Sequence, residues 1–201
     1  MSEEFYRIKR LPPYVFAEVN AMKAEARAGG EDIIDLGMGN PDGMPAQHVI
    51  DKLSETANDP TAHRYSASKG IKGLRLAQAN YFKRRFDVDL APESEVIVTL
   101  GSKEGFANLA QAISAPGDVI LAPDPSYPLH SFGFIIAGAS IRNVPAHTPE
   151  EYLSNLGKAV KHCVPPPTAM VLCYPSNPPA AVCELDFYKA AVKCSKKHDL
   201  W

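Results

Sequence analysis

Residues 96–105 read V-I-V-T-L-G-S-K-E-G, and this stretch decides the fold. The first five residues are mostly β-branched and apolar, which predicts a buried β-strand over residues 96–100. Gly101 ends the strand, and Ser102 occupies the position of a helix N-cap. Apolar side chains then recur at offsets of 0, 3, 4 and 7, which mark one face of a helix: Phe106, Leu109, Ala110 and Ile113.

The turn between this strand and this helix suits a phosphate. The first N–H groups of a helix have no partner within the helix, and the helix dipole adds positive partial charge at the same end. Such a turn therefore directs several donors at one anion. An ordinary strand-to-helix connection with a serine cap would have the same sequence pattern, so residues 96–105 alone leave both interpretations open.

Strands and helices alternate from residue 96 onward. Short apolar runs predict further strands at 119–122, 140–144 and 169–173, and helical spacing covers 129–137, 150–161 and 187–194. This alternation is typical of βαβ units. We therefore expect an α/β fold with a mostly parallel sheet and flanking helices.

The sequence before residue 96 predicts an arm, helices and special loops. Residues 1–13 end in a Pro-Pro pair and form the arm. Predicted elements then follow as a helix at 14–28, a strand at 33–36, a glycine-rich loop at 37–43, and helices at 46–58 and 74–85. The basic residues 83–85 suit the C-terminal end of the last of these helices, so we interpret them as a solvated helix end.

Composition and charge exclude several classes of partner. The net charge of the 201 residues is -2, which does not suggest nucleic acid or an anionic membrane. The longest nearly apolar run, residues 132–139, is too short to span a bilayer. The acidic start has no apolar region of a secretory signal. The four cysteines lack C-x-x-C spacing, which argues against zinc and fits reduced thiols, so we expect a cytoplasmic protein.

Three loops are expected to meet at one edge of the sheet. Ligands of open parallel sheets bind outside the carboxyl ends of the strands. Loops follow these ends at Gly101–Lys103, at Ser126–Tyr127 and at Asn177–Pro178. Three prolines within residues 123–128 hold Tyr127 in place, either for packing or to stack on a flat ligand. The residues therefore favour a domain that binds a phosphorylated, planar molecule.

A serine-nucleophile motif is considered and set aside. Residues 66–69 read S-A-S-K, which matches the S-x-x-K motif of penicillin-binding enzymes. The companion motifs S-D-N and K-T-G are absent from the sequence, and Ser66 lies in a loop instead of opening a helix. A nicotinamide-binding domain is also disfavoured, because no G-x-G-x-x-G opens a helix after a strand.

The motifs in their order resemble those of the class I/II, fold type I aminotransferases that use pyridoxal 5'-phosphate. The residues that carry the resemblance are M-G-N-P-D-G at 38–43, Tyr65-Ser66, G-S-K-E-G at 101–105, P-S-Y-P at 125–128 and Y-P-S-N-P at 174–178. Together with R-L-P-P-Y-V-F at 10–16, they look most similar to bacterial alanine (glutamate-pyruvate) aminotransferases. The resemblance extends over nearly the whole chain.

The resemblance implies roles for six residues. Ser102 and Lys103 would hold the cofactor phosphate, and Tyr127 would stack on the pyridine ring. Asn177 would donate a hydrogen bond to the phenolic oxygen of the cofactor. Tyr65 would reach the phosphate of the neighbouring subunit's cofactor, which implies a homodimer whose N-terminal arm packs on the partner. Gly39 would lie beside the substrate carboxylate.

The resemblance also implies that the chain holds only the N-terminal half of such an enzyme. Residues 1–30 would be the N-terminal arm and helix, and residues 31–201 an incomplete cofactor-binding large domain. The lysine that binds the cofactor covalently would lie beyond Trp201, so we expect these 201 residues alone to be inactive. The wider family mostly has Thr-Gly where this chain has Pro179-Ala180. Proline has no backbone N–H, and the loss of this donor could loosen the turn after Asn177.

Three functions remain open at this point. The favoured one is an aminotransferase acting on an amino acid, with alanine and glutamate as the expected pair, and a 2-oxo acid. A related enzyme with the same cofactor, such as a C–S lyase or an aminocyclopropane carboxylate synthase, shares these motifs. A non-catalytic module that binds or joins a full-length relative is the third.

Overall fold

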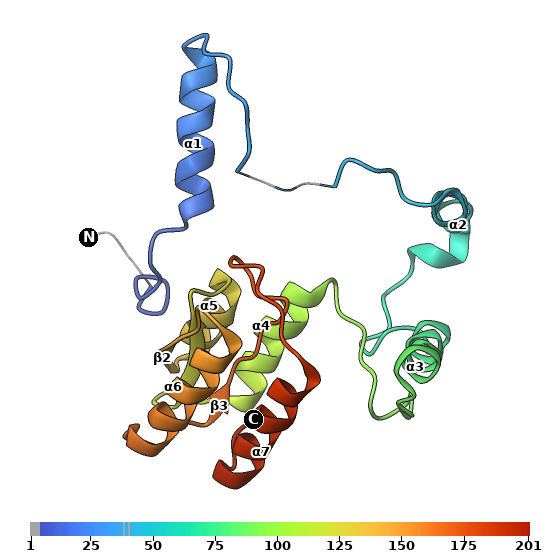
Figure 1. Cartoon of the computed structure of the whole chain (residues 1–201). Coiled ribbons are helices and arrows are strands. Elements are labelled where there is room, and N and C mark those ends of the chain that lie inside the picture. The colour runs from blue at the N-terminus through green and yellow to red at the C-terminus, as the bar shows by residue number, and fades with distance from the viewer. Residues whose placement is uncertain (1–4, 38, 40) are drawn as a thin grey trace. The chain divides into compact units, whose positions relative to one another are not determined.

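The computed structural model describes residues 5–37, 39 and 41–201, and Figure 1 shows their elements. Met38 and Asn40 of the glycine-rich motif lie outside the described residues. The chain divides into two compact units, which are described separately below. One unit covers residues 13–98, and the other combines the arm up to Pro12 with residues 99–201.

Apart from two predicted strands, the elements follow the predicted order with shifted ends. The unit of residues 13–98 contains α1 (Val15–Ala28), α2 (Gln47–Ala57), the 3-10 helix η1 (Pro60–His63) and α3 (Lys72–Phe86). The other unit contains α4 (Ser102–Ile113), β1 (Val119–Asp124), α5 (Pro128–Ala137), β2 (Ser140–Pro145), α6 (Pro149–His162), β3 (Ala169–Met170) and α7 (Leu185–His198).

The sheet of the second unit is parallel, as predicted. Its three strands have the order β2-β1-β3, and Ile120 of β1 lies opposite Ile141 on one side and Ala169 on the other. The backbone of Trp201 continues the ladder at the outer edge of β3. Its N–H donates to Thr168 O (3.1 Å), and its carbonyl accepts from Met170 N (3.0 Å).

Alternate side chains of β1 serve two cores, one on each face of the sheet. Ile120 packs with Ala110 of α4 and Phe134 of α5. Leu121 packs on the opposite face with Leu156 of α6 and with residues of α7. Figure 1 shows the two helix pairs of this unit, α4 with α5 and α6 with α7. This layered arrangement confirms the expected α/β fold class.

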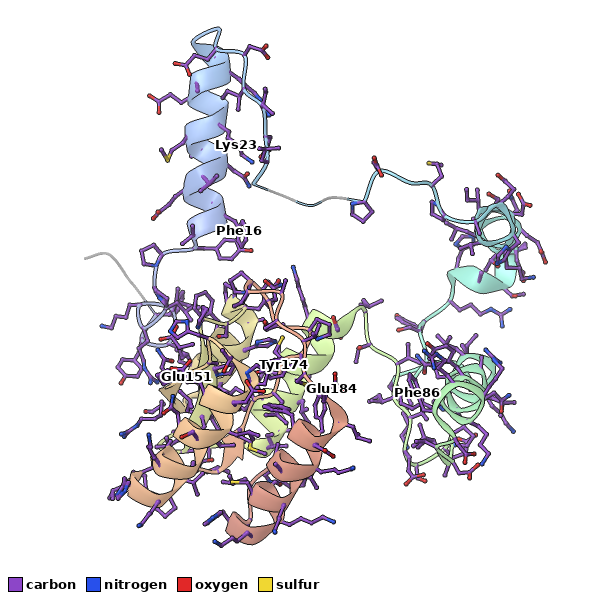
Figure 2. All side chains as sticks on the ribbon, viewed as in Figure 1. Phe16, Lys23, Phe86, Glu151, Tyr174 and Glu184 are labelled. Atoms are coloured by element: carbon purple, nitrogen blue, oxygen red, sulfur yellow. The ribbon has the colours of Figure 1, made fainter. Side chains whose placement is uncertain are left out.

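The helices of residues 13–98 bury few side chains. Neither α1 nor α2 contains a buried residue, and Leu53 of α2 is 72% exposed. Lys23 of α1, labelled in Figure 2, forms an ion pair with Asp35 (2.8 Å). That carboxylate also accepts a hydrogen bond from Gly37 N (3.0 Å), and the bond from Lys23 followed by this one lowers the pKa of Asp35.

Two predicted strands are wrong. Residues 96–100 and 33–36 have no strand assignment, and Leu100 and Leu36 are 92% and 91% exposed. A strand exists only when a neighbouring strand completes its backbone hydrogen bonds, and the described sheet pairs neither run. Both runs have the apolar residues typical of a strand, but the described residues provide no neighbouring strand to pair with them and bury their side chains.

Candidate cofactor-binding site

The turn before α4 is made by Gly101 and leads directly into the helix. Gly101 is the N-cap residue, with a φ of +87° that favours glycine, and Ser102 is the first helical residue. The prediction that Ser102 would be the N-cap is therefore wrong by one position. Within the described chain no side chain caps this helix end, and the side chains of Ser102 and Lys103 are exposed. The helix N-terminus thus presents donors to solvent.

Two side chains that the sequence analysis did not single out stabilise this turn. Glu104 Oε2 accepts a hydrogen bond from Leu100 N (2.5 Å), and Thr99 Oγ1 donates to Gly101 O (3.0 Å). A Cβ added at Gly105 would lie 3.1 Å from Thr99 Oγ1, which leaves little space for a side chain there. Glutamate at the third helical position is a known capping signal, so Glu104 was detectable in the sequence.

Tyr127 lies next to this turn. It is the N-cap residue of α5, half-buried and followed by Pro128 at the first helical position. Lys103 Nζ lies 5.9 Å from the centroid of the Tyr127 ring. Residues predicted separately from two loops are thus brought together, a cation and an aromatic ring beside a helix N-terminus.

His130 is a further residue of this region that the sequence analysis missed. Its ring lies 5.8 Å from Tyr127 and 5.5 Å from Phe106, measured between ring centroids. Burial lowers its pKa. Its buried Nδ1 has no hydrogen-bond partner in the described part of the chain. The position three residues after Tyr127 at the start of a helix was its only sequence signal.

The loop that carries Asn177 is closed by three hydrogen bonds. Ser176 N donates to Ala181 O (2.8 Å), Ala180 N donates to Ser176 O (2.9 Å), and Ala181 N donates to Ser176 Oγ (2.8 Å). None of these bonds uses Pro179, so the missing donor of that residue does not open the turn. Asn177 itself is exposed at the tip of the loop.

The base of the same loop packs through Tyr174, labelled in Figure 2. The Tyr174 ring lies 4.6 Å from the Phe187 ring, edge to face. Tyr188 Oη donates to Tyr174 O (3.3 Å). Burial raises the pKa of Tyr174. The contacts to α7 hold the base of the loop that carries Asn177.

The predicted site residues fall into two groups. Ser102, Lys103, Tyr127 and Asn177 belong to one compact unit, in which the loops with Tyr127 and Asn177 follow the carboxyl ends of the parallel strands β1 and β3. Tyr65 and Gly39 belong to the other unit, and both are exposed. No group of three or more His, Cys, Asp or Glu residues forms a metal site in the described ranges. None of the helices described is long and apolar enough to cross a membrane.

Comparison with known proteins gives a consistent result. The family model of aminotransferase class I and II matches residues 31–201. The protein AatC of Rhizobium meliloti (strain 1021) is 59% identical over 198 residues, which are 98% of this chain and 49% of that protein. The glutamate-pyruvate aminotransferase AlaC of Escherichia coli (strain K12) is 46% identical over 196 residues, 98% of this chain and 48% of that protein.

More distant proteins match over the same extent. The LL-diaminopimelate aminotransferase of Moorella thermoacetica is 40% identical over 98% of this chain and 51% of its own length. A mutant aspartate aminotransferase of Thermus thermophilus has a similar structure, with a TM-score of 0.88 at 28% identity over 100% of this chain and 52% of that chain. The chain spans about half the length of the curated relatives it matches.

Proposed function

Because the chain belongs to the class I and II aminotransferase family, we propose that it forms the cofactor-binding part of an enzyme that moves an amino group from an amino acid to a 2-oxo acid. The cofactor of this proposal is pyridoxal 5'-phosphate. The observation that carries the proposal is the arrangement at α4, where an uncapped helix start, Lys103 and the Tyr127 ring lie together. This set fits a molecule with a phosphate and a flat ring.

Different residues of the chain would bind different parts of this cofactor. Ser102 and Lys103, with the first N–H groups of α4, would hold the phosphate, and Tyr127 would pack against the pyridine ring. Asn177 would donate a hydrogen bond to the phenolic oxygen. When bound, the cofactor supplies an electron sink that makes the Cα–H bond of an amino acid acidic.

The remaining parts of the proposal concern substrate and assembly. Gly39 would lie beside the substrate carboxylate, where the absence of a side chain allows close approach. Tyr65 would serve the phosphate of the neighbouring subunit's cofactor in a homodimer, with the arm packed on the partner. The cytoplasmic location stays a prediction.

Alanine and glutamate are the proposed amino donors. The 46% identity to the Escherichia coli glutamate-pyruvate enzyme supports this pair. A second candidate is LL-diaminopimelate, since an aminotransferase for that substrate is 40% identical over nearly the whole chain. Both identities refer to the half of each relative that the chain covers, so the substrate of the whole protein is a proposal.

A cofactor titration and a mass measurement test the proposal. The intact mass of the protein in its own cells establishes whether further sequence follows these residues. Titration of the purified protein, freed of cofactor, with pyridoxal 5'-phosphate and followed by absorbance should show saturable binding whose apparent dissociation constant rises with added inorganic phosphate. Assays with alanine, glutamate and LL-diaminopimelate would then identify the donor. Absence of saturable binding would refute the proposal.

A matched pair of variants makes the titration specific to the site. Ser102→Ala removes a proposed phosphate ligand and should weaken binding. Ser195→Ala removes a hydroxyl of α7 that donates to Leu200 O, which is unrelated to the site, and should leave binding unchanged. Equal effects of both variants would contradict the assignment of Ser102.

A further inference from the structure

Arg75 of α3 is the one buried charged residue among those the structure describes, with 8% of its surface exposed. A buried guanidinium is costly unless its donors are satisfied. A surface helix normally presents its arginines to solvent, and Arg84 and Arg85 of α3 are indeed exposed. The burial of Arg75 therefore needs an explanation in terms of its contacts.

The guanidinium connects three segments of the unit of residues 13–98. Arg75 Nη1 donates to Gly70 O (2.6 Å) and Nε donates to Pro92 O (2.9 Å). Nη2 donates to Glu93 Oε2 (2.6 Å). The planar fork of arginine makes such bonds in fixed directions, so α3, the 65–70 loop and the 92–93 segment are held in one arrangement.

The two carbonyl contacts matter more than the ion pair. The Glu93 side chain is 63% exposed, and exposed ion pairs contribute little to stability. Gly70 O and Pro92 O are backbone atoms, so the bonds that they accept from Arg75 link the main chain of two segments directly. Arg75 thus acts mainly as a clamp between two backbone segments.

The 65–70 loop is fixed to the following segment at a second point. Val98 N donates to Lys69 O (3.1 Å), and a Cβ added at Gly70 would lie 2.2 Å from Val98 Cγ2. Gly70 N donates to Ala67 O (2.8 Å), which closes the turn inside the loop. The C-terminal end of the 65–70 loop, at Lys69 and Gly70, is therefore fixed by contacts with Arg75 and Val98.

We infer that Arg75 is a positioning residue, which holds the 65–70 loop so that Tyr65 can reach a cofactor phosphate. This inference rests on the proposed function for the role of Tyr65. Arg75 does not itself contact the cofactor; it acts through the backbone of the loop.

A double-mutant cycle in the complete protein tests the inference. Arg75→Lys keeps the charge but loses the fork, and it should raise the dissociation constant for pyridoxal 5'-phosphate about tenfold, the effect of about one charged hydrogen bond. In a Tyr65→Phe background the same substitution should have little further effect, because it acts through Tyr65. Equal losses in both backgrounds would overturn the inference.

Hydrogen exchange gives a readout that needs no cofactor. In Arg75→Lys, the Gly70 amide should exchange faster, whereas Arg84→Lys, an exposed substitution on the same helix, should leave it unchanged. Unchanged exchange at residues 67–70 in Arg75→Lys would overturn the inference. If Arg75→Lys does not fold, Arg75→Gln, which replaces the guanidinium with a shorter amide and cannot keep both carbonyl contacts, should shift exchange in the same direction. Unchanged exchange in that variant would likewise overturn it.

The two hypotheses fail in distinguishable ways. If Tyr65→Phe alone leaves cofactor affinity unchanged, the role of Tyr65 in the proposed function is refuted. The positioning role of Arg75 is then refuted as well, because it acts through Tyr65. If Tyr65→Phe weakens binding while Arg75→Lys is additive with it, only the inference about Arg75 is refuted.

Discussion

The ammonium group of Lys103 lies 5.9 Å from the centre of the Tyr127 ring. The two residues are 24 positions apart in the sequence and come from the starts of α4 and α5. Their proximity combines positive charge with an aromatic face, next to a helix start that already favours anions. This relationship supports the first prediction.

Lys103→Met should weaken binding of pyridoxal 5'-phosphate by about 10- to 100-fold, because a hydrogen bond to a charged group contributes about 1.5–3 kcal/mol. Titration followed by absorbance measures the effect. Lys189→Met, which removes an exposed lysine paired with Asp186 on α7, is the control and should leave the affinity unchanged. A wild-type affinity in Lys103→Met would contradict the prediction.

Ala180→Gly should stabilise the protein by about 1 kcal/mol. Ala180 has a φ of +59°, a left-handed conformation that costs a residue with a Cβ about 1–2 kcal/mol, partly offset by the greater entropy of glycine in the unfolded chain. Urea unfolding measures the change. Ala181→Gly, next to it without a positive φ, should destabilise instead. A lower midpoint for Ala180→Gly would show that the turn gains nothing from glycine.

Tyr152→Phe should reduce the pH dependence of stability at alkaline pH. Tyr152 is buried and donates to Val171 O (2.8 Å), and burial raises its pKa above the usual value. The folded state thus keeps a proton that the unfolded state loses from about pH 10 upward, so stability should fall as pH rises through that range. Urea midpoints at pH 8 to 11 measure the slope. An equally steep slope in Tyr152→Phe would assign it to other groups.

His130→Phe should flatten the loss of stability at acidic pH. Burial lowers the pKa of His130, so the unfolded state binds a proton more readily than the folded state. Stability should therefore fall as pH drops below about 6.5, the usual histidine value. Comparison of urea midpoints at pH 5 and pH 7 tests this. His48→Gln, at an exposed position of α2, is the control and should keep the wild-type difference.

Local signals predicted the second unit well. The helices α4 to α7 have regular apolar spacing, and β1 and β2 lie between clear turn residues and find their bonded neighbours within the same unit, so the local patterns agreed with the structure. The 96–100 run shows the opposite case. Its residues favour a strand, but a strand needs a bonded neighbour, and no local pattern reveals whether one is present.

The candidate site was predictable only in part, for related reasons. Tyr127 and Asn177 were identified because carboxyl ends of parallel strands share an edge. His130 and Arg75 were missed because each is polar and lies on a helix, where the usual expectation is exposure to solvent. Their surroundings depend on how separate segments pack, such as the loop ending at Gly70 and the segment at Pro92, whose carbonyl groups both accept from Arg75.

The central place of β1 has a consequence for the order of folding. Val119 pairs with Ser140, 21 positions later, whereas Ile120 pairs with Ala169, 49 positions later. Loop-closure entropy favours the nearer pairing by about 0.7 kcal/mol, and the nearer partner also leaves the ribosome first. We therefore expect β1, α5 and β2 to form a nascent unit during synthesis. We expect β3 to pair later with the free edge of β1, so the two edges of β1 would be completed one after the other during folding.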